Sequence, residues 1–234
     1  MWRVESDLGD AGAPYDRRAA IYDRLVRSRV YNALAWSTAP AHYREFAAVA
    51  IESASGPLLE VAAGSAAATA ALHAHSERPT TLVDLSRAML ERAGRRLAAA
   101  AGHDEAELPL PHIRLIQADL LALRFPDHGF TTVLGLGLTH LFDDLAAVVG
   151  ALRVQLAPGG QLHLSGLVAG TRRATRYLEL LHRCGEVARP TTAEELAVAL
   201  GRPVDFHTIG CMAYATLSAE EDARQPLAQS EDRP

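Results

Sequence analysis

Between residues 58 and 167, short apolar runs alternate with longer stretches in which apolar residues recur every three or four positions. The short runs are bounded by Gly, Pro or charged residues, as buried strands usually are. The longer stretches have the spacing of one helix face. The pattern predicts strands at 58–61, 81–84, 113–116, 131–135 and 161–167 and helices at 67–75, 86–101 and 142–156. We therefore expect a parallel sheet wrapped by crossover helices, that is, a doubly wound, Rossmann-like α/β fold.

Two helical patterns precede the sheet. The first covers residues 15–36 and places on one face Tyr22, Leu25, Val26, Val30 and Leu34. The second follows a break at 37–40, with Thr38 as its expected cap and Pro40 in its first turn. Its predicted buried side consists of Tyr43, Phe46, Val49 and Ala50. Together these two helices are expected to form a helical lid over residues 15–54.

The chain after the fifth strand predicts two more helices and a hairpin. The helices are expected at 171–187 and 192–200, and the strands at 204–208 and 213–217. Paired as an antiparallel hairpin at the sheet edge, these strands bring the expected sheet to seven strands. The predicted organisation is a flexible N-terminus at 1–14, the lid at 15–54, one sheet domain at 55–218 and a flexible tail at 219–234.

Composition narrows the class of protein. The chain has 234 residues, of which 49% are hydrophobic and 22% charged, which suits one globular domain. Two cysteines and the lack of an N-terminal signal pattern favour a reducing, cytoplasmic location, and no uncharged stretch is long enough to span a bilayer. A net charge of −5 offers no basic face for nucleic acid, so we expect a small-molecule substrate and a monomer or homodimer.

Three carboxylates lie at the ends of the first three strands of the predicted sheet, or just beyond. Glu60, Asp84 and Asp119 are separated by about one strand-helix-strand step each. Right-handed crossovers place successive strand ends side by side, so all three should emerge at the carboxyl edge of the sheet. Ligands bind at this edge in open α/β sheets.

Several motifs resemble those of class I S-adenosylmethionine (SAM)-dependent methyltransferases. Residues 60–66 read Glu-x-Ala-x-Gly-x-Ala, similar to the family's acid-x-G-x-G-x-G loop, and residues 84–90 match its Asp-x-Ser-x-x-Met-Leu signature. Asp119 stands where the family has a third acid. Residues 123–130 and the Pro-Gly-Gly turn at 158–160 resemble two further family segments. Within the family, the chain resembles the small-molecule enzymes of the ubiquinone/menaquinone-biosynthesis methyltransferase-like group.

The resemblance implies a SAM site with assigned roles. Glu60 would receive the amino group of SAM directly or through water, Asp84 the ribose hydroxyls and Asp119 the adenine N6. Met89 and Leu120 would pack on the adenine faces, and Tyr22 resembles a lid residue that closes on the methionine part. The other residues expected to contact SAM are Ala62, Gly64, Leu85 and Leu136. No metal site is expected, because the histidines lack ligand spacing.

The resemblance also suggests residues for the methyl acceptor. His140 follows the fourth strand, where the family often faces its substrate, and its ordinary pKa range suits a general base. Trp36, Arg172 and Arg176 are candidate substrate contacts, the arginines for an acidic group. Each has a structural alternative: His140 could fill a pocket, Trp36 could be a core residue, and the arginines could be solvated charges at a helix start.

Two alanines in the 60–66 loop leave other functions open. Alanine disfavours positive φ, so Ala62 fits the loop if its φ is negative, whereas Ala66 could displace the cofactor. Two alternatives remain: a non-methylating enzyme of cyclase or decarboxylase type, and a non-catalytic cofactor-binding protein. A nicotinamide dehydrogenase is disfavoured, because this loop has a single Gly and an acid before it.

Overall fold

The fold is built on one eight-stranded sheet. The structure, a computed structural model, describes residues 4–6, 28–102, 110–125, 129–201 and 205–219. The strands lie in the order β1-β4-β3-β2-β5-β6-β8-β7. Their bounds are β1 Val4–Ser6, β2 Leu58–Val61, β3 Thr80–Asp84, β4 Ile113–Gln117, β5 Phe130–Gly135, β6 Leu156–Leu167, β7 Asp205–Ile209 and β8 Met212–Ser218. Strands β1 to β6 are parallel, and β8 pairs antiparallel with both β6 and β7.

This topology confirms the predicted Rossmann-like α/β fold and its antiparallel edge hairpin. The sheet has eight strands rather than the expected seven, because Val4–Ser6 adds a parallel strand beside β4. Two side-chain contacts support this pairing: Arg114 Nη2 lies 2.7 Å from Glu5 Oε2, and Ser6 Oγ donates to Gln117 Oε1 at 3.1 Å. The extra strand was missed because three residues are too few to show an alternating pattern.

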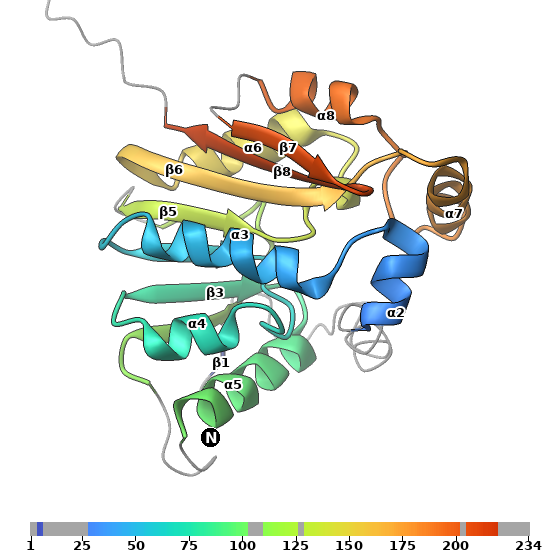
Figure 1. The fold of residues 1–234 in the computed structure, drawn as a ribbon. Helices are drawn as coiled ribbons and strands as arrows, with labels where there is room; N and C mark the ends of the chain where they lie inside the picture. The colour runs from blue at the N-terminus through green and yellow to red at the C-terminus, as the bar shows by residue number, and fades with distance from the viewer. Residues whose placement is uncertain (1–3, 7–27, 103–109, 126–128, 202–204, 220–234) are drawn as a thin grey trace, which may run out of the picture.

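Helices cover both faces of the sheet (Figure 1). One face carries α3 (Pro40–Glu52), α4 (Ala70–His75) and α5 (Arg87–Ala101), and the other carries α6 (Leu145–Arg153) and α8 (Ala193–Ala199). Near the carboxyl end of β6 lie α7 (Arg172–Arg183), α2 (Arg29–Tyr31) and the π-helical turn η1 (Asn32–Trp36). In the described part of the chain, no helix has the length and apolar character needed to cross a membrane.

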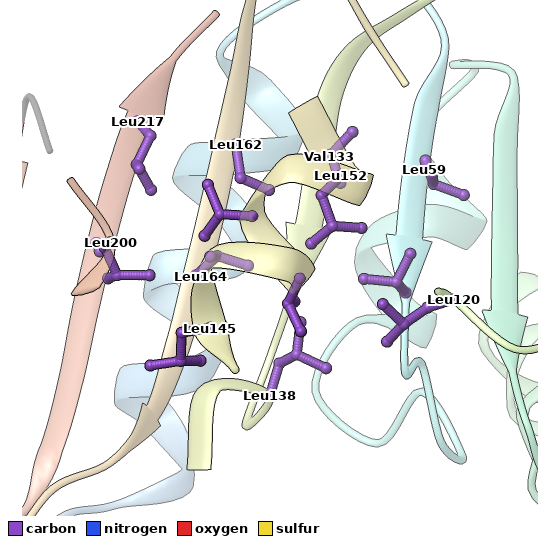
Figure 2. Packing of buried hydrophobic residues seen from close by; sticks show 14 of the residues in the cluster. Leu59, Leu120, Val133, Leu138, Leu145, Leu152, Leu162, Leu164, Leu200 and Leu217 are labelled. Atoms are coloured by element: carbon purple, nitrogen blue, oxygen red, sulfur yellow. The ribbon is translucent and has the colours of Figure 1, made fainter. Parts of the chain in front are cut away.

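The largest buried cluster lies between the sheet and helices α6 and α8. Figure 2 shows side chains of the strands beside those of α6 and of Leu200, which directly follows α8. Its labelled members are Leu59, Leu120, Val133, Leu138, Leu145, Leu152, Leu162, Leu164, Leu200 and Leu217. Each fully buried leucine stabilises the fold by about 1.5–3 kcal/mol relative to exposure, so this cluster fixes the strands whose ends carry the candidate site.

Several element boundaries differ from the sequence predictions. Helix α6 begins only at Leu145, because Asp144 caps it by accepting the amide of Ala147 at 2.9 Å. The predicted turn at 158–160 is a bulge inside β6, where the register passes from the pair Phe130 and Leu156 to the pair Thr132 and Gln161.

The N-terminal helices also differ from the predictions. The cap of α3 is Ala39 rather than Thr38. Val49 is 64% exposed, and Val30 and Leu34 also face outward, so the predicted apolar faces are only partly buried. Of the first predicted helix, residues 15–27 lie outside the described part of the chain.

His163 in β6 is a buried histidine on the α3 side of the sheet. Its ring meets Phe46 edge-on at 5.8 Å between ring centroids, and its Nδ1 is hydrogen-bonded to Thr216 Oγ1 at 3.2 Å. Burial, with a smaller effect of the Arg78 charge, lowers the pKa of His163 to about 4. The folded protein therefore disfavours the protonated form of this side chain.

We expect His163 to make the protein less stable in acid. Below pH 6.5 the unfolded chain binds a proton at His163 that the folded chain does not, so the free energy of unfolding falls until the pH reaches about 4. Urea unfolding at pH 6.5 and pH 4.5 should show a loss about 2 kcal/mol larger for the wild type than for His163→Gln. His75→Gln, at an exposed histidine, is the control. Equal losses in the wild type and His163→Gln would contradict the prediction.

Candidate functional site

The order of the strands in the sheet reverses between β2 and β5. Strands β3 and β4 continue the sheet on one side of β2, and β5 and β6 continue it on the other. Val61 and Gly135, the last residues of β2 and β5, are register partners. The loops that follow them, at 62–69 and 136–138, therefore start side by side. In open α/β sheets this is the position where ligands bind.

The loop after β2 has an unusual backbone for its sequence. Ala62, Gly64 and Ala66 all have positive φ, at 48°, 53° and 49°. The condition under which Ala62 would fit the loop easily, a negative φ, is therefore not met. An alanine in this region costs about 1 kcal/mol or more, so the loop keeps a glycine-type conformation against the preference of two of its residues. A Cβ at Gly64 would meet open space, so no neighbouring side chain or backbone covers this position.

Asp84, the last residue of β3, is hydrogen-bonded to this loop. Its Oδ2 accepts the Gly64 amide at 2.7 Å, and its Oδ1 accepts the Ser86 amide at 2.8 Å. Ser86 in turn caps α5, because its Oγ accepts the Met89 amide. The carboxylate thus joins three elements of the carboxyl edge, namely the β2 loop, the end of β3 and the start of α5. The structure brings together the predicted pair Asp84 and Gly64.

The side chain of Glu60 points into the interior of the protein and not toward the open side of the loop. Its side chain is 2% exposed and is directed to the face covered by α4. Its Oε1 accepts the Thr69 hydroxyl at 3.1 Å, and its Oε2 lies 2.5 Å from His73 Nε2. Because Glu60 is almost completely buried and both of its oxygens have partners inside the fold, its position does not agree with a direct contact to the SAM amino group. The alternative contact through water stays a prediction.

Thr69 and His73 are the residues of this region that sequence reasoning missed. Thr69 is the N-cap residue of α4, and His73 follows it by four positions, so both side chains lie on the side of the helix that covers β2. The sequence does contain a signal for this pair: a hydroxyl and an imidazole four residues apart, shortly after a buried strand that contains an acid. The sequence analysis considered the histidines only as possible metal ligands, so a hydrogen bond from His73 was not predicted.

The apolar residues expected to contact SAM are buried to different extents. Leu85 is largely exposed just after β3, whereas Met89 and Leu120 belong to the buried core. Asp119 is exposed, and its Oδ1 accepts the Leu121 amide at 2.9 Å. Leu136 is half-buried against the cluster that includes Trp36, Leu134 and Tyr214. Leu85 and Asp119 thus face outward at the carboxyl edge, while Met89 and Leu120 support it from below.

His140 lies in the η2 turn (Thr139–Leu141), beside a cavity of about 140 Å³. Its Nδ1 accepts the Leu167 amide at 3.2 Å, so the neutral ring carries its proton on Nε2. Burial lowers the pKa of His140 to about 4, which makes it a weak base. The cavity is lined by Thr139, His140, Phe142, Asp143, Leu145, Leu167, Leu178, Val187, Ala188, Arg189, Pro190, Thr191, Glu195 and Ala199. This geometry favours His140 as a hydrogen-bond donor over a base.

The other predicted substrate residues are not gathered at this cavity. Trp36 is 3% exposed and stacks on Tyr177 of α7, with 5.2 Å between ring centroids, so its indole is a packing element. Arg172 and Arg176 are exposed in the first turns of α7. Tyr22 lies outside the described residues.

Comparison with known proteins agrees with this geometry. Residues 58–160, which contain the β2 loop, Asp84 and Asp119, match a family model described as a methyltransferase domain. The match covers a little under half of the chain and describes a methyltransferase domain over these residues. The resemblance to class I SAM-dependent methyltransferases, and within them to the ubiquinone/menaquinone group, stays a prediction. No curated protein was found to match the sequence.

Solved structures of methyltransferases share the fold at low sequence identity. Geranyl diphosphate C-methyltransferase from Streptomyces coelicolor A3(2), in complex with Mg²⁺, geranyl diphosphate and S-adenosyl-L-homocysteine (SAH), has a TM-score of 0.61 and 14% identity, covering 89% of this chain and 98% of that one. The DhpI–SAH complex has a TM-score of 0.57 and 22% identity, covering 86% and 91%. A Haloferax volcanii protein in complex with the methyltransferase activator Trm112 has a TM-score of 0.63 and 13% identity, covering 90% and 99%.

Proposed function

We propose that this protein is a SAM-dependent methyltransferase that acts on a small-molecule metabolite. The observation that carries the proposal is the β2 loop, whose three positive-φ residues bring the Gly64 amide onto Asp84 at the reversal of strand order. An alanine keeps such a conformation only where the surrounding structure enforces it, which is common at ligand sites. Support also comes from the methyltransferase-domain match over the same residues and from neighbours crystallised with SAH.

The residues at the carboxyl edge suit the ribose and adenine of SAM. The Asp84 carboxylate would accept hydroxyl groups of the ribose, the open space beside Gly64 would admit the cofactor against the backbone, and Leu85 and Asp119 would border the adenine. When bound, SAM supplies an activated methyl group. The contribution of the chain is then mainly to orient the acceptor for in-line displacement, which by itself can provide much of the rate.

We assign the acceptor to the side of the edge that carries His140. The adjoining cavity is lined by apolar side chains and by Thr139, His140, Asp143, Arg189, Thr191 and Glu195, and its volume of about 140 Å³ suits a small group rather than a polymer. His140, neutral at pH 7 and protonated on Nε2, would donate a hydrogen bond to the acceptor. Arg172 and Arg176, exposed at the start of α7, would attract an anionic group of a larger acceptor. The net charge of −5 disfavours nucleic acid as the substrate. The proposal includes a cytoplasmic location and a monomer or homodimer.

Calorimetry with SAM and with SAH tests the proposal first. We expect both to bind with micromolar Kd, because the loop and Asp84 are already in place in the free protein. Failure of both to bind below the millimolar range would refute the proposal. Incubation with a metabolite extract and methyl-labelled SAM then tests turnover. Binding without transfer of label to any small molecule would favour the non-methylating enzyme or the non-catalytic binding protein.

A further inference from the structure

Glu60, Thr69 and His73, which we call the Glu60 network, form a buried polar group at the base of the β2 loop. Glu60 is 2% exposed, and Thr69 and His73 are fully buried. Thr69 follows Glu60 by nine residues and His73 by thirteen, so the two hydrogen bonds join the end of β2 to the start of α4. The loop with its three positive-φ residues lies between these two ends.

The composition of this network is not explained by packing alone. A buried carboxylate is unfavourable unless it is fully hydrogen-bonded, and apolar side chains of similar volume often replace such groups without loss of stability. In addition, the Nδ1 of His73 is buried without a hydrogen-bond partner in the described part of the chain. Directional hydrogen bonds nevertheless do what apolar contacts do not, because they fix the distance and orientation of the two segments that they join.

The loop needs such a constraint at both ends. Its tip is held by Asp84, which accepts the Gly64 amide. Its flanks contain Ala62 and Ala66, which would leave the left-handed region if the ends of the loop were free to move. Movement at either alanine would turn the Gly64 amide away from Asp84. Glycines at both positions would adopt the same conformation without this tendency.

We propose that Thr69 and His73 are positioning residues for the cofactor: through Glu60 they hold the β2 loop in its left-handed conformation. This inference rests on the proposed function only as far as the loop binds SAM. In the free protein it concerns the conformation of the loop itself. It predicts that the loop needs the Glu60 network because Ala62 and Ala66 disfavour the left-handed conformation that glycines would adopt without it.

Thr69→Val tests the inference, since it removes one hydrogen bond to Glu60 with little change in volume. We expect the Gly64 amide to exchange with solvent at least tenfold faster in the free protein, and the affinity for SAH to fall about tenfold. Thr69→Ser, which restores the hydroxyl, should return both values to within about threefold of the wild type. His73→Gln is the second variant and should act in the same direction, because a shorter amide reaches Glu60 less well.

Glycine at both loop positions provides the decisive control. In a protein that carries Ala62→Gly and Ala66→Gly, Thr69→Val should lower the affinity for SAH by less than threefold. A structural role of Thr69 alone would instead give the same loss in both backgrounds. Unchanged Gly64 exchange in Thr69→Val would also overturn the inference. Amide exchange is measured without cofactor, so a protein that binds no SAH would refute the proposed function while leaving this test intact.

Discussion

Asp84→Ala is expected to lower the affinity for SAM at least 100-fold. The side chain accepts the amides of Gly64 and Ser86, and hydrogen bonds to a charged group contribute about 1.5–3 kcal/mol each. The proposed ribose contact is lost as well. A loss of about 3 kcal/mol corresponds to roughly 100-fold in affinity, which calorimetry with SAM measures directly.

Two variants separate this effect from general damage. Glu91→Ala removes an exposed carboxylate of α5 and should leave the affinity for SAM unchanged. His140→Ala should also bind SAM like the wild type but turn over more slowly, since His140 is assigned to the acceptor. If His140→Ala lost as much affinity as Asp84→Ala, its assignment to the acceptor would be wrong. An affinity of Asp84→Ala within threefold of the wild type would remove Asp84 from the cofactor site.

Gly210→Ala is expected to destabilise the protein by about 3 kcal/mol or more. Gly210 forms the turn between β7 and β8, with φ of 61°, and a Cβ there would collide with the main-chain oxygens of Trp36 and Ser37. These oxygens belong to the segment that crosses the carboxyl edge, where the Cys211 amide donates to Trp36 O at 2.8 Å. The cost of a positive φ for alanine and the cost of displacing the backbone of residues 36 and 37 therefore add in the free energy of unfolding. Urea unfolding gives the change in free energy.

Gly185→Ala is the matched control for this prediction. Gly185 also has a positive φ, of 72°, but a Cβ there would meet open space. It should therefore lose only the conformational term of about 1 kcal/mol. Equal losses in the two variants would show that the contact between the β7–β8 turn and the N-terminal segment does not stabilise the fold.

The sequence predicted the sheet well, because its buried strands have a strong local pattern. Strands β2 to β6, the edge hairpin and the helices between them follow from apolar spacing, and motif resemblance located Asp84 next to the β2 loop. The carboxyl-edge position of these residues also follows from topology alone.

The details that escaped prediction depend on contacts between distant residues. A sequence does not show that Glu60 turns toward α4, because an acid at a strand end can face a ligand or a helix with equal ease. Trp36 was assigned to substrate, but its ring is buried by Tyr177, which lies far along the chain. The positive φ of Ala62 runs against the local preference of alanine, so only the surrounding structure could reveal it.

The short strand β1 has a consequence for the behaviour of this protein at high concentration. Without it, β4 would present unpaired amides and carbonyls along the border of the sheet, and such a border is a template for pairing with another copy. Val4–Ser6 occupies the register of Leu115–Gln117, and the opposite border carries the charged strand residue Asp205 with His207. A form shortened by its first six residues would therefore be prone to aggregate through β4, even with its core and cofactor loop unchanged.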